Sequence, residues 1–240
     1  MEMTTLEDVR AAVLQQLRCD QLLGLKFVPL SRPQRPGLAE KQRRLAALDE
    51  QSVRGCTKCR LCETRTRTVF GQGNPAARLV FVGEAPGFDE DKQGLAFVGK
   101  AGQLLTKMIE AMGLTRDDVY ICNVIKCRPP NNREPAADEI LSCSPYLREQ
   151  LCIIEPEVIV ALGSPAAKTL LNTAQSIGKL RGSFHEYFFS GVTGEGPCIP
   201  LMPTYHPAYL LRSPDEKRKS WDDLKLVMAM MENSAAGGVR

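Results

Sequence analysis

Short apolar segments alternate with amphipathic segments from Arg78 onward, and this alternation restricts the fold more than any other feature of the chain. The apolar segments have the length of buried strands and lie at residues 78–83, 118–125, 157–163 and, as a shorter one, about 197–203. The segments with helical spacing lie at residues 101–113, 134–156, 164–172 and about 214–231. Strands that alternate with helices predict an α/β fold, in which helices cover both faces of a parallel sheet.

Several distinctive residues come directly after the predicted strands. Gly83, Asn123 and Gly163 each stand where a strand ends, and the segment "TYHPAYLLR" (204–212) follows the last one. In parallel sheets, ligands bind beyond the carboxyl ends of the strands, at the point where the strand order reverses. The sequence therefore predicts a binding site at this edge of the sheet.

The first 50 residues have a different pattern. Helical apolar spacing at residues 6–25 is interrupted by the proline-rich stretch 29–37, and a second helical pattern follows at residues 38–50. We therefore expect a helical extension with a proline-rich linker at residues 1–50 and one larger domain at residues 51–235.

The charge of the chain does not decide whether it binds nucleic acid. The net charge of +3 is too small to indicate a nucleic-acid partner by itself. Between Lys41 and Arg67 eight basic residues stand against three acidic ones, which fits either a solvated helix face or a phosphate-binding surface. The chain has no apolar stretch of about 18 residues and its N-terminus lacks the pattern of a secretory signal, so we expect a cytoplasmic protein without a membrane span.

The nine cysteines indicate metal ligation, because cytosolic thiols are kept reduced. Cys56, Cys59 and Cys62 follow at spacings of three, and Cys127 and Cys143 add thiols at loop or helix-start positions. Four thiolates suit a structural zinc ion or a four-iron cluster. Our choice of ligands is Cys56, Cys59, Cys127 and Cys143, while Cys62 stays open as a spare thiol or an alternative ligand. We expect small buried apolar side chains at the remaining positions, Cys19, Cys122, Cys152 and Cys198.

The loop "GEAPGFDEDKQGLAFVGKAG" (83–102) combines glycines, four carboxylates and Phe97. Gly83 permits a tight turn and close approach of the backbone to a ligand. The carboxylates fit a solvated, helix-capping loop, while the exposed backbone amides could donate to a carbonyl oxygen or an anion. The spacing of a phosphate-binding Walker loop is absent.

Only two histidines occur in the chain. His185 lies among aromatic residues on a probable strand, where a core or surface role is expected. His206 precedes Pro207, which fixes the chain, so its imidazole is held at a loop. The following "AYLLR" (208–212) fits either an apolar wedge beside a phosphate contact or the first turn of a core-packed helix.

Three motifs in one order resemble a known family. The segments "GEAPGFDEDKQGLAFVGKAGQLL" (83–105), "ICNVIKCRPPNNREP" (121–135) and "HPAYLLRSP" (206–214), together with the cysteine pattern, look like the iron-sulfur-containing family 4 uracil-DNA glycosylases. The resemblance runs from about Cys56 to the C-terminal helix. It implies a three-layer α/β/α sandwich with a four-stranded parallel sheet, and a [4Fe–4S] cluster on the four chosen cysteines.

The resemblance also implies roles for individual residues. Phe97 would stack on uracil, Asn123 would bind its pyrimidine edge, the backbone around Ala85 would help to bind its carbonyls, and His206 would donate to uracil O2. Glu84 and Glu90 would handle the attacking water or the cationic sugar. Contacts to DNA are expected from Leu210, which would fill the gap left by the flipped nucleotide, and from Arg212 and Arg128.

The expected protein is thus a monomeric repair enzyme that hydrolyses deoxyuridine in DNA and leaves an abasic site. A different class remains open, a DNA-binding or redox-sensing module whose iron-sulfur cluster accompanies no hydrolysis. A structural zinc protein is a third possibility.

Overall fold

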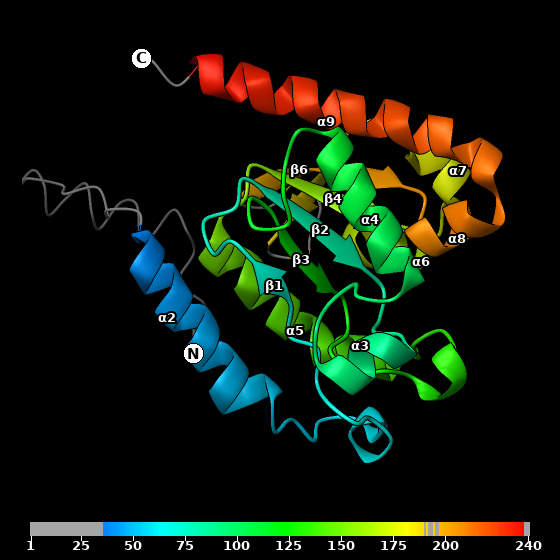
Figure 1. The fold of residues 1–240 in the computed structure, drawn as a ribbon. Helices are drawn as coiled ribbons and strands as arrows, with labels where there is room; N and C mark the ends of the chain where they lie inside the picture. Colours follow the sequence, from blue (N-terminus) through cyan, green and yellow to red (C-terminus); the bar gives the residue numbers. More distant parts are fainter. Residues whose placement is uncertain (1–35, 190, 192–193, 195–196, 238–240) are drawn as a thin grey trace, which may run out of the picture. The chain divides into compact units, whose positions relative to one another are not determined.

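A computed structural model describes residues 36–189, 191, 194 and 197–237 of the chain. Its centre is a six-stranded sheet with the order β1-β3-β2-β4-β6-β5 (Figure 1). The strands are β1 (Gln72–Gly73), β2 (Leu79–Gly83), β3 (Tyr120–Asn123), β4 (Val158–Leu162), β5 (His185–Phe188) and β6 (Cys198–Thr204). The predicted parallel strands are confirmed, because β3, β2, β4 and β6 run parallel. The sheet also has antiparallel edge pairings of β1 and β5, which were not predicted.

Helices cover both faces of this sheet, as Figure 1 shows. On β2, Val80 and Val82 point into a core shared with α5 (Ala137–Ile154) and α6 (Ser164–Leu171). The alternate residues Leu79 and Phe81 point into a second core, shared with α4 (Lys100–Ala111) and α9 (Lys217–Gly237). Successive side chains of a strand face opposite sides, so a sheet covered on both faces needs the continuous apolar runs seen in the sequence. The three-layer α/β/α architecture is confirmed.

Apart from helix α2, described below, the remaining elements are short. They are the helices α3 (Phe88–Gln93), α7 (Ile177–Leu180) and α8 (Pro207–Arg212), the 3-10 turns Arg60–Glu63, Pro130–Asn132 and Pro214–Glu216, and the π-helical turn Asp49–Val53. The strand expected at about residues 197–203 is β6, whose bounds differ from the expectation by one residue. One predicted boundary was wrong. The last helix starts after a 3-10 turn and extends beyond residue 231.

The helix predicted at residues 38–50 is α2 (Leu38–Leu48). It is joined to α5, because Lys41 Nζ donates to the carbonyl of Ile154 over 2.8 Å and pairs with Glu155 over 2.9 Å. The helical pattern at residues 6–25 lies outside the described residues, and the expected domain boundary near residue 50 stays a prediction. Among the described helices, none combines the length and apolar character needed to span a membrane.

The strand register places the predicted site. Strand β2 has β3, which follows it in the chain, on one side and β4 on the other, so the strand order reverses around β2. Gly83 lies opposite Asn123 across β2 and β3, and Leu162 lies opposite Thr204 across β4 and β6. The carboxyl ends of four parallel strands therefore meet at one edge, where this topology places ligand sites.

Candidate active site

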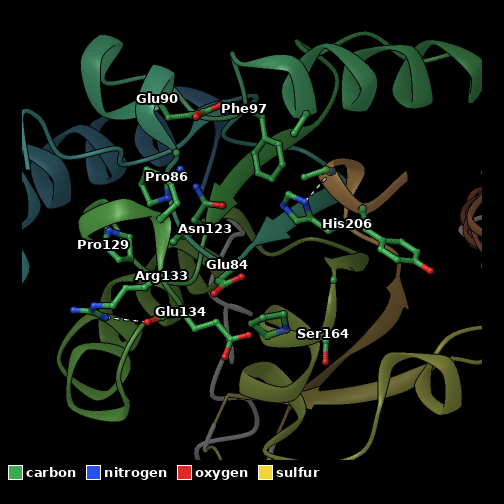
Figure 2. A pocket seen from close by; sticks show the side chains of 18 of the residues that line it. Glu84, Pro86, Glu90, Phe97, Asn123, Pro129, Arg133, Glu134, Ser164 and His206 are labelled. Atoms are coloured by element: carbon green, nitrogen blue, oxygen red, sulfur yellow. Dashed lines mark hydrogen bonds between the residues drawn. The ribbon is translucent and has the colours of Figure 1, made fainter. Parts of the chain in front are cut away.

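A cavity of about 790 Å³ lies at this edge of the sheet (Figure 2). Its wall contains all of the predicted catalytic and base-binding residues and one predicted DNA contact: Glu84, Ala85, Glu90, Phe97, Asn123, His206 and Arg212. These side chains come from the ends of β2, β3 and β6 and from the loops that follow. The predicted site residues are thus brought together, except for Arg128 and Leu210, which are not part of the cavity wall.

Asn123 presents an unpaired polar atom at the end of β3. The side chain is 1% exposed, and its Oδ1 atom has no hydrogen-bond partner among the described residues. A buried acceptor without a partner costs about 1–3 kcal/mol, so a donor on a bound ligand would remove this penalty. The residue is therefore suited to recognise an N–H group inside the cavity.

The buried side chain of Lys126, which is 1% exposed, holds the backbone at Asn123. Lys126 Nζ donates to the carbonyl oxygen of Asn123 over 2.8 Å and to Gln150 Oε1 over 2.5 Å. Its own backbone N–H donates to Cys143 Sγ over 3.2 Å. One buried lysine thus connects Asn123 with a predicted metal ligand, Cys143, a connection that sequence reasoning missed.

Phe97 has a left-handed backbone conformation with φ at 54°. The turn is held by Glu90, whose Oε1 atom accepts the backbone N–H groups of Val98 and Gly99 over 2.9 and 3.0 Å. A Cβ at Gly102 would lie 1.9 Å from the carbonyl oxygen of Phe97, so only glycine fits there. These contacts place the phenyl ring in the cavity wall.

His206 lies next to Phe97 in the cavity wall, with ring centroids 5.7 Å apart (Figure 2). Its Nδ1 atom accepts the backbone N–H of Ala208 over 3.1 Å, so the neutral ring carries its proton on Nε2. Burial, with a smaller contribution from Arg212, lowers the pKa of His206 to about 4. At neutral pH the imidazole is therefore an uncharged donor.

Glu84 is a carboxyl group in the cavity wall with a strongly shifted pKa. Burial, followed by repulsion from Glu134, raises the pKa of Glu84 to about 7. Glu134 also lines the cavity, although sequence reasoning passed over it. Its position in the motif "NNREP" was the available signal, because that loop follows the strand that carries Asn123.

The placement of Leu210 contradicts its predicted contact with DNA. Leu210 is only 1% exposed, because the first turn of α8 packs it against the interior. The neighbouring Leu211 is 44% exposed, and Tyr209 and Arg212 line the cavity. The apolar group that α8 presents to solvent is therefore Leu211.

The four chosen cysteines line a second, small cavity together. Two side-chain donors point at their sulfur atoms. Arg65 Nη1 donates to Cys127 Sγ over 3.2 Å, and the Tyr146 hydroxyl donates to Cys56 Sγ over 3.3 Å. Within the described ranges, no three His, Cys, Asp or Glu side chains are arranged to hold a single metal ion.

The other cysteines were predicted with mixed success. Cys122 is buried as expected, whereas Cys152 and Cys198 are exposed, so the prediction of buried side chains was wrong for these two. Cys62 is half-buried and is not part of the cavity lining, and Cys19 lies outside the described residues.

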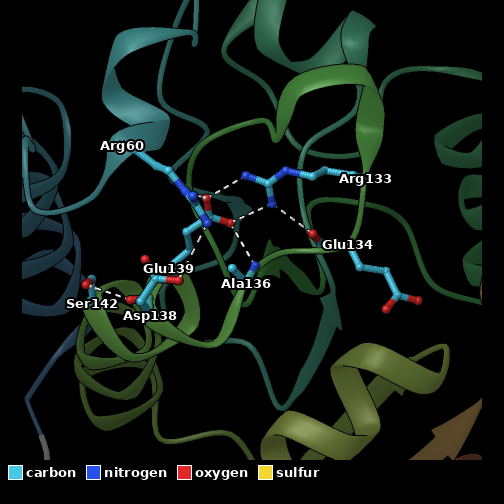
Figure 3. Close-up of polar contacts among 7 residues, drawn as sticks. All are labelled: Arg60, Arg133, Glu134, Ala136, Asp138, Glu139 and Ser142. Atoms are coloured by element: carbon cyan, nitrogen blue, oxygen red, sulfur yellow. Dashed lines mark hydrogen bonds and ion pairs between the residues drawn. The ribbon is translucent and has the colours of Figure 1, made fainter.

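A buried carboxylate, Glu139, binds one arginine from each of two loops (Figure 3). Glu139, which is 0% exposed, accepts hydrogen bonds from Arg60 over 2.8 Å and from both terminal nitrogens of Arg133 over 2.6 and 2.8 Å. Hydrogen bonds, first of all from Arg133, hold its pKa at about 2 despite the opposing effect of burial. Arg60 follows Cys59, and Arg133 lies in the wall of the large cavity, so this cluster fixes one loop relative to the other.

Comparison with known proteins agrees with this geometry. The profile of the Uracil DNA glycosylase superfamily matches residues 70–225. A type-4 uracil-DNA glycosylase of Saccharolobus solfataricus is 46% identical over 180 residues, which cover 73% of this chain and 81% of the relative. Another, from Archaeoglobus fulgidus, is 43% identical over 189 residues, which cover 76% and 92%. A type-5 uracil-DNA glycosylase of Pyrobaculum aerophilum is 34% identical over 159 residues, which cover 60% of this chain and 67% of the relative.

The α/β/α fold with a cavity at the switch point of the sheet defines a class of ligand-binding protein, and the matches show to which family of that class the chain belongs. The chain belongs to the uracil-DNA glycosylase superfamily, with type-4 uracil-DNA glycosylases as relatives over most of its length. The expectation of a uracil-DNA glycosylase is confirmed.

Proposed function

We propose that the large cavity binds a deoxyuridine flipped out of DNA and hydrolyses its N-glycosidic bond, releasing uracil and leaving an abasic site. The observation that carries this proposal is the buried, unpaired Oδ1 atom of Asn123, which lies in a wall shared with Phe97 and His206.

Recognition begins at the pyrimidine edge. Uracil N3–H donates to Asn123 Oδ1, and the amide nitrogen of the same side chain donates to uracil O4. Cytosine presents an acceptor at N3 and a donor at C4, so it would leave both amide groups mismatched. A buried unpaired polar group is costly, and this cost gives the discrimination between the two bases. Phe97 offers its ring for stacking on the base.

His206 acts on the departing base. As the C1′–N1 bond breaks, its electron pair leaves with uracil and negative charge grows on O2. A neutral imidazole with its proton on Nε2 donates to that oxygen, and the bond strengthens as the charge develops. The low pKa keeps His206 uncharged at neutral pH.

Glu84 acts on the sugar and the water. Its carboxylate stabilises the cationic sugar and orients the water whose oxygen adds to C1′, while the proton lost by that water goes to the carboxylate. Glu90 shares the predicted catalytic assignment, and its bonds to Val98 and Gly99 support a positioning role through the Phe97 turn. The backbone around Ala85, also in the wall, is placed to receive a carbonyl of the base.

DNA is the macromolecular substrate. Flipping a base costs a few kcal/mol, which contacts to the backbone and an apolar side chain in the gap must offset. We assign phosphate contacts to Arg212 and Arg128 and the gap to the exposed Leu211 in place of Leu210. The enzyme is proposed to act as a monomer in the cytoplasm, where thiols stay reduced.

The four cysteines fit a [4Fe–4S] cluster as its ligands. Their side chains line one cavity, and hydrogen-bond donors from Arg65, Tyr146 and the Lys126 backbone point at three of the sulfur atoms. Such donors stabilise thiolate ligands. When bound, the cluster would cross-link the loop of Cys56 and Cys59 to Cys127 and to helix α5, and we assign it a structural role.

Release of free uracil from an oligonucleotide with one U:G mispair tests the proposal. The native protein is expected to release uracil and leave an alkali-labile site. Asn123→Ala should slow release about 100-fold, the magnitude typical of losing one transition-state donor, and should keep salt-sensitive DNA binding. Asn233→Ala, at an exposed position of α9, is the matched control. Binding without release by the native protein would favour the non-catalytic iron-sulfur module.

Iron analysis and visible absorbance test the cluster separately from activity. We expect a brown protein with about four iron atoms per chain, and loss of the colour in Cys143→Ser. Zinc without iron would show that the four thiolates hold a structural zinc ion.

A further inference from the structure

An aromatic ring and a guanidinium group form an exposed stack beside the large cavity. Phe88, the first residue of α3, is 58% exposed, and the guanidinium carbon of Arg128 lies 5.1 Å from the centre of its ring. Arg128 is kept in place by its Nε atom, which donates to Asn132 Oδ1 over 2.7 Å. We refer to this pair as the Phe88–Arg128 stack.

The chain places the stack at the rim of the cavity. Phe88 directly follows Gly87, and Arg128 directly precedes Pro129, and both of these neighbours line the cavity. Asn132, which holds Arg128, lines it as well. The stack is therefore continuous with the wall, yet neither of its members belongs to the wall.

Among the residues that the structure describes, Arg128 has no partner of opposite charge. No carboxylate of the described residues forms an ion pair with it, whereas Arg133 and Arg78 pair with Glu139 and Glu157. A cation left without a carboxylate next to a DNA-processing cavity favours a phosphate as its partner. Aromatic and guanidinium planes are also the surfaces on which proteins stack unpaired bases.

We propose that the Phe88–Arg128 stack binds the nucleotide next to the flipped deoxyuridine, with the base of that nucleotide on Phe88 and its phosphate on Arg128. This inference rests on the proposed function, because the cavity must hold the extruded uracil. Phe88 would then contribute to the affinity of the enzyme for the strand next to the deoxyuridine. The prediction that Arg128 contacts DNA thereby gains a specific partner.

A double-mutant cycle, in which Phe88 of the protein and a neighbouring base of the DNA are each removed, tests the contact between them. The variants are Phe88→Ala and the control Leu226→Ala, which also removes an exposed apolar side chain but lies on α9 and is 44% exposed. The substrates are single strands with one deoxyuridine, either with normal neighbours or with the base of the 5′ or the 3′ neighbour removed. The readout is kcat/KM for uracil release.

We expect Phe88→Ala to lower kcat/KM about tenfold on the normal strand, within the range of losing one stacked base. Removing one neighbouring base should lower the native value by a similar factor and have little further effect on Phe88→Ala. Leu226→Ala should behave as the native protein. The proposal would be overturned if the loss in kcat/KM from Phe88→Ala and the loss from removing a neighbouring base multiplied in full, for the 5′ and for the 3′ neighbour alike.

Two further measurements distinguish a lost contact at the Phe88–Arg128 stack from damage to the large cavity. Inhibition by free uracil should be unchanged in Phe88→Ala, and a clear loss of inhibition would mean that the variant damaged the cavity and that the assignment is wrong. Binding of a strand with a tetrahydrofuran residue in place of deoxyuridine needs no catalysis. For this ligand, Arg128→Gln should reduce the salt slope of the binding constant by about one, and an unchanged slope would overturn the phosphate contact. If the native protein released no uracil, the proposed function would fail while these binding results still decided the stack.

Discussion

Gly83 and Asn123 lie opposite each other in the parallel pair of β2 and β3, and the missing side chain of the glycine leaves room for the asparagine. A Cβ at residue 83 would lie 2.4 Å from Asn123 Oδ1 and 2.6 Å from Phe97 Cζ. Gly83 is not among the glycines with a positive φ, so the pocket and not the turn requires a glycine here.

Gly83→Ala should displace both base-binding side chains at once. We expect uracil release to fall about 100-fold or more, with a loss of about 1–3 kcal/mol in the free energy of unfolding from overpacking. Gly37→Ala is the control, because a Cβ there would have no neighbour within 4 Å. Near-native release by Gly83→Ala would show that the placement of Asn123 and Phe97 tolerates this contact.

The pH dependence of kcat/KM should follow Glu84. Its raised pKa of about 7 means that the active carboxylate forms only as the pH rises through that value, so the native profile should have an acidic limb there. His206, with a pKa of about 4, stays neutral over this limb and does not contribute to it. Glu84→Gln should be slower and should lose the limb.

Glu134→Gln is the companion variant for that profile. It removes the like charge that helps to raise the pKa of Glu84, so the limb should move to lower pH. A limb that stays in place in both variants would assign the titration to another group. The raised pKa also predicts that the contribution of Glu84 to the free energy of unfolding falls as the pH rises from 4.5 to about 7.

Glu139 should matter more for stability than an ordinary surface ion pair. Glu139 is 0% exposed, whereas Arg60 and Arg133 are 60% and 39% exposed, so Glu139→Ala leaves no buried charge and should lower the free energy of unfolding by about 2 kcal/mol through its lost charge-assisted hydrogen bonds. Glu157→Ala breaks the exposed pair with Arg78 and should cost at most about 1 kcal/mol. Urea unfolding measures both, and equal losses would contradict the clamping role shown in Figure 3. Because the pKa of Glu139 is lowered to about 2, its contribution is present above pH 4.5 and is lost as the pH falls through about 2.

The sequence predicted the parts of the fold that depend on local pattern. The four parallel strands are continuous apolar runs, and Asn123 and His206 were placed in the site because each follows a strand. Antiparallel β1 was missed because it has only two residues, and no periodicity can be read from so short a segment.

Predictions failed where burial depends on distant contacts. Leu210 and Leu211 are adjacent and equally apolar, and only the packing of α8 decides that the first is buried and the second is exposed. Cys152 is exposed for the same reason, although its helix end is apolar. Glu139 and Lys126 look like surface residues in the sequence, and their partners Arg60 and Gln150 lie far away along the chain.

The central claim is that Asn123 reads the edge of uracil, and inhibition by free bases tests it most directly. The native enzyme should be inhibited by uracil and much more weakly by cytosine, because uracil presents N3–H to the unpaired Oδ1 atom, whereas cytosine presents an acceptor at N3. In Asn123→Ala the inhibition by uracil should fall to the level of cytosine. Equal inhibition of the native enzyme by the two bases would contradict the claim.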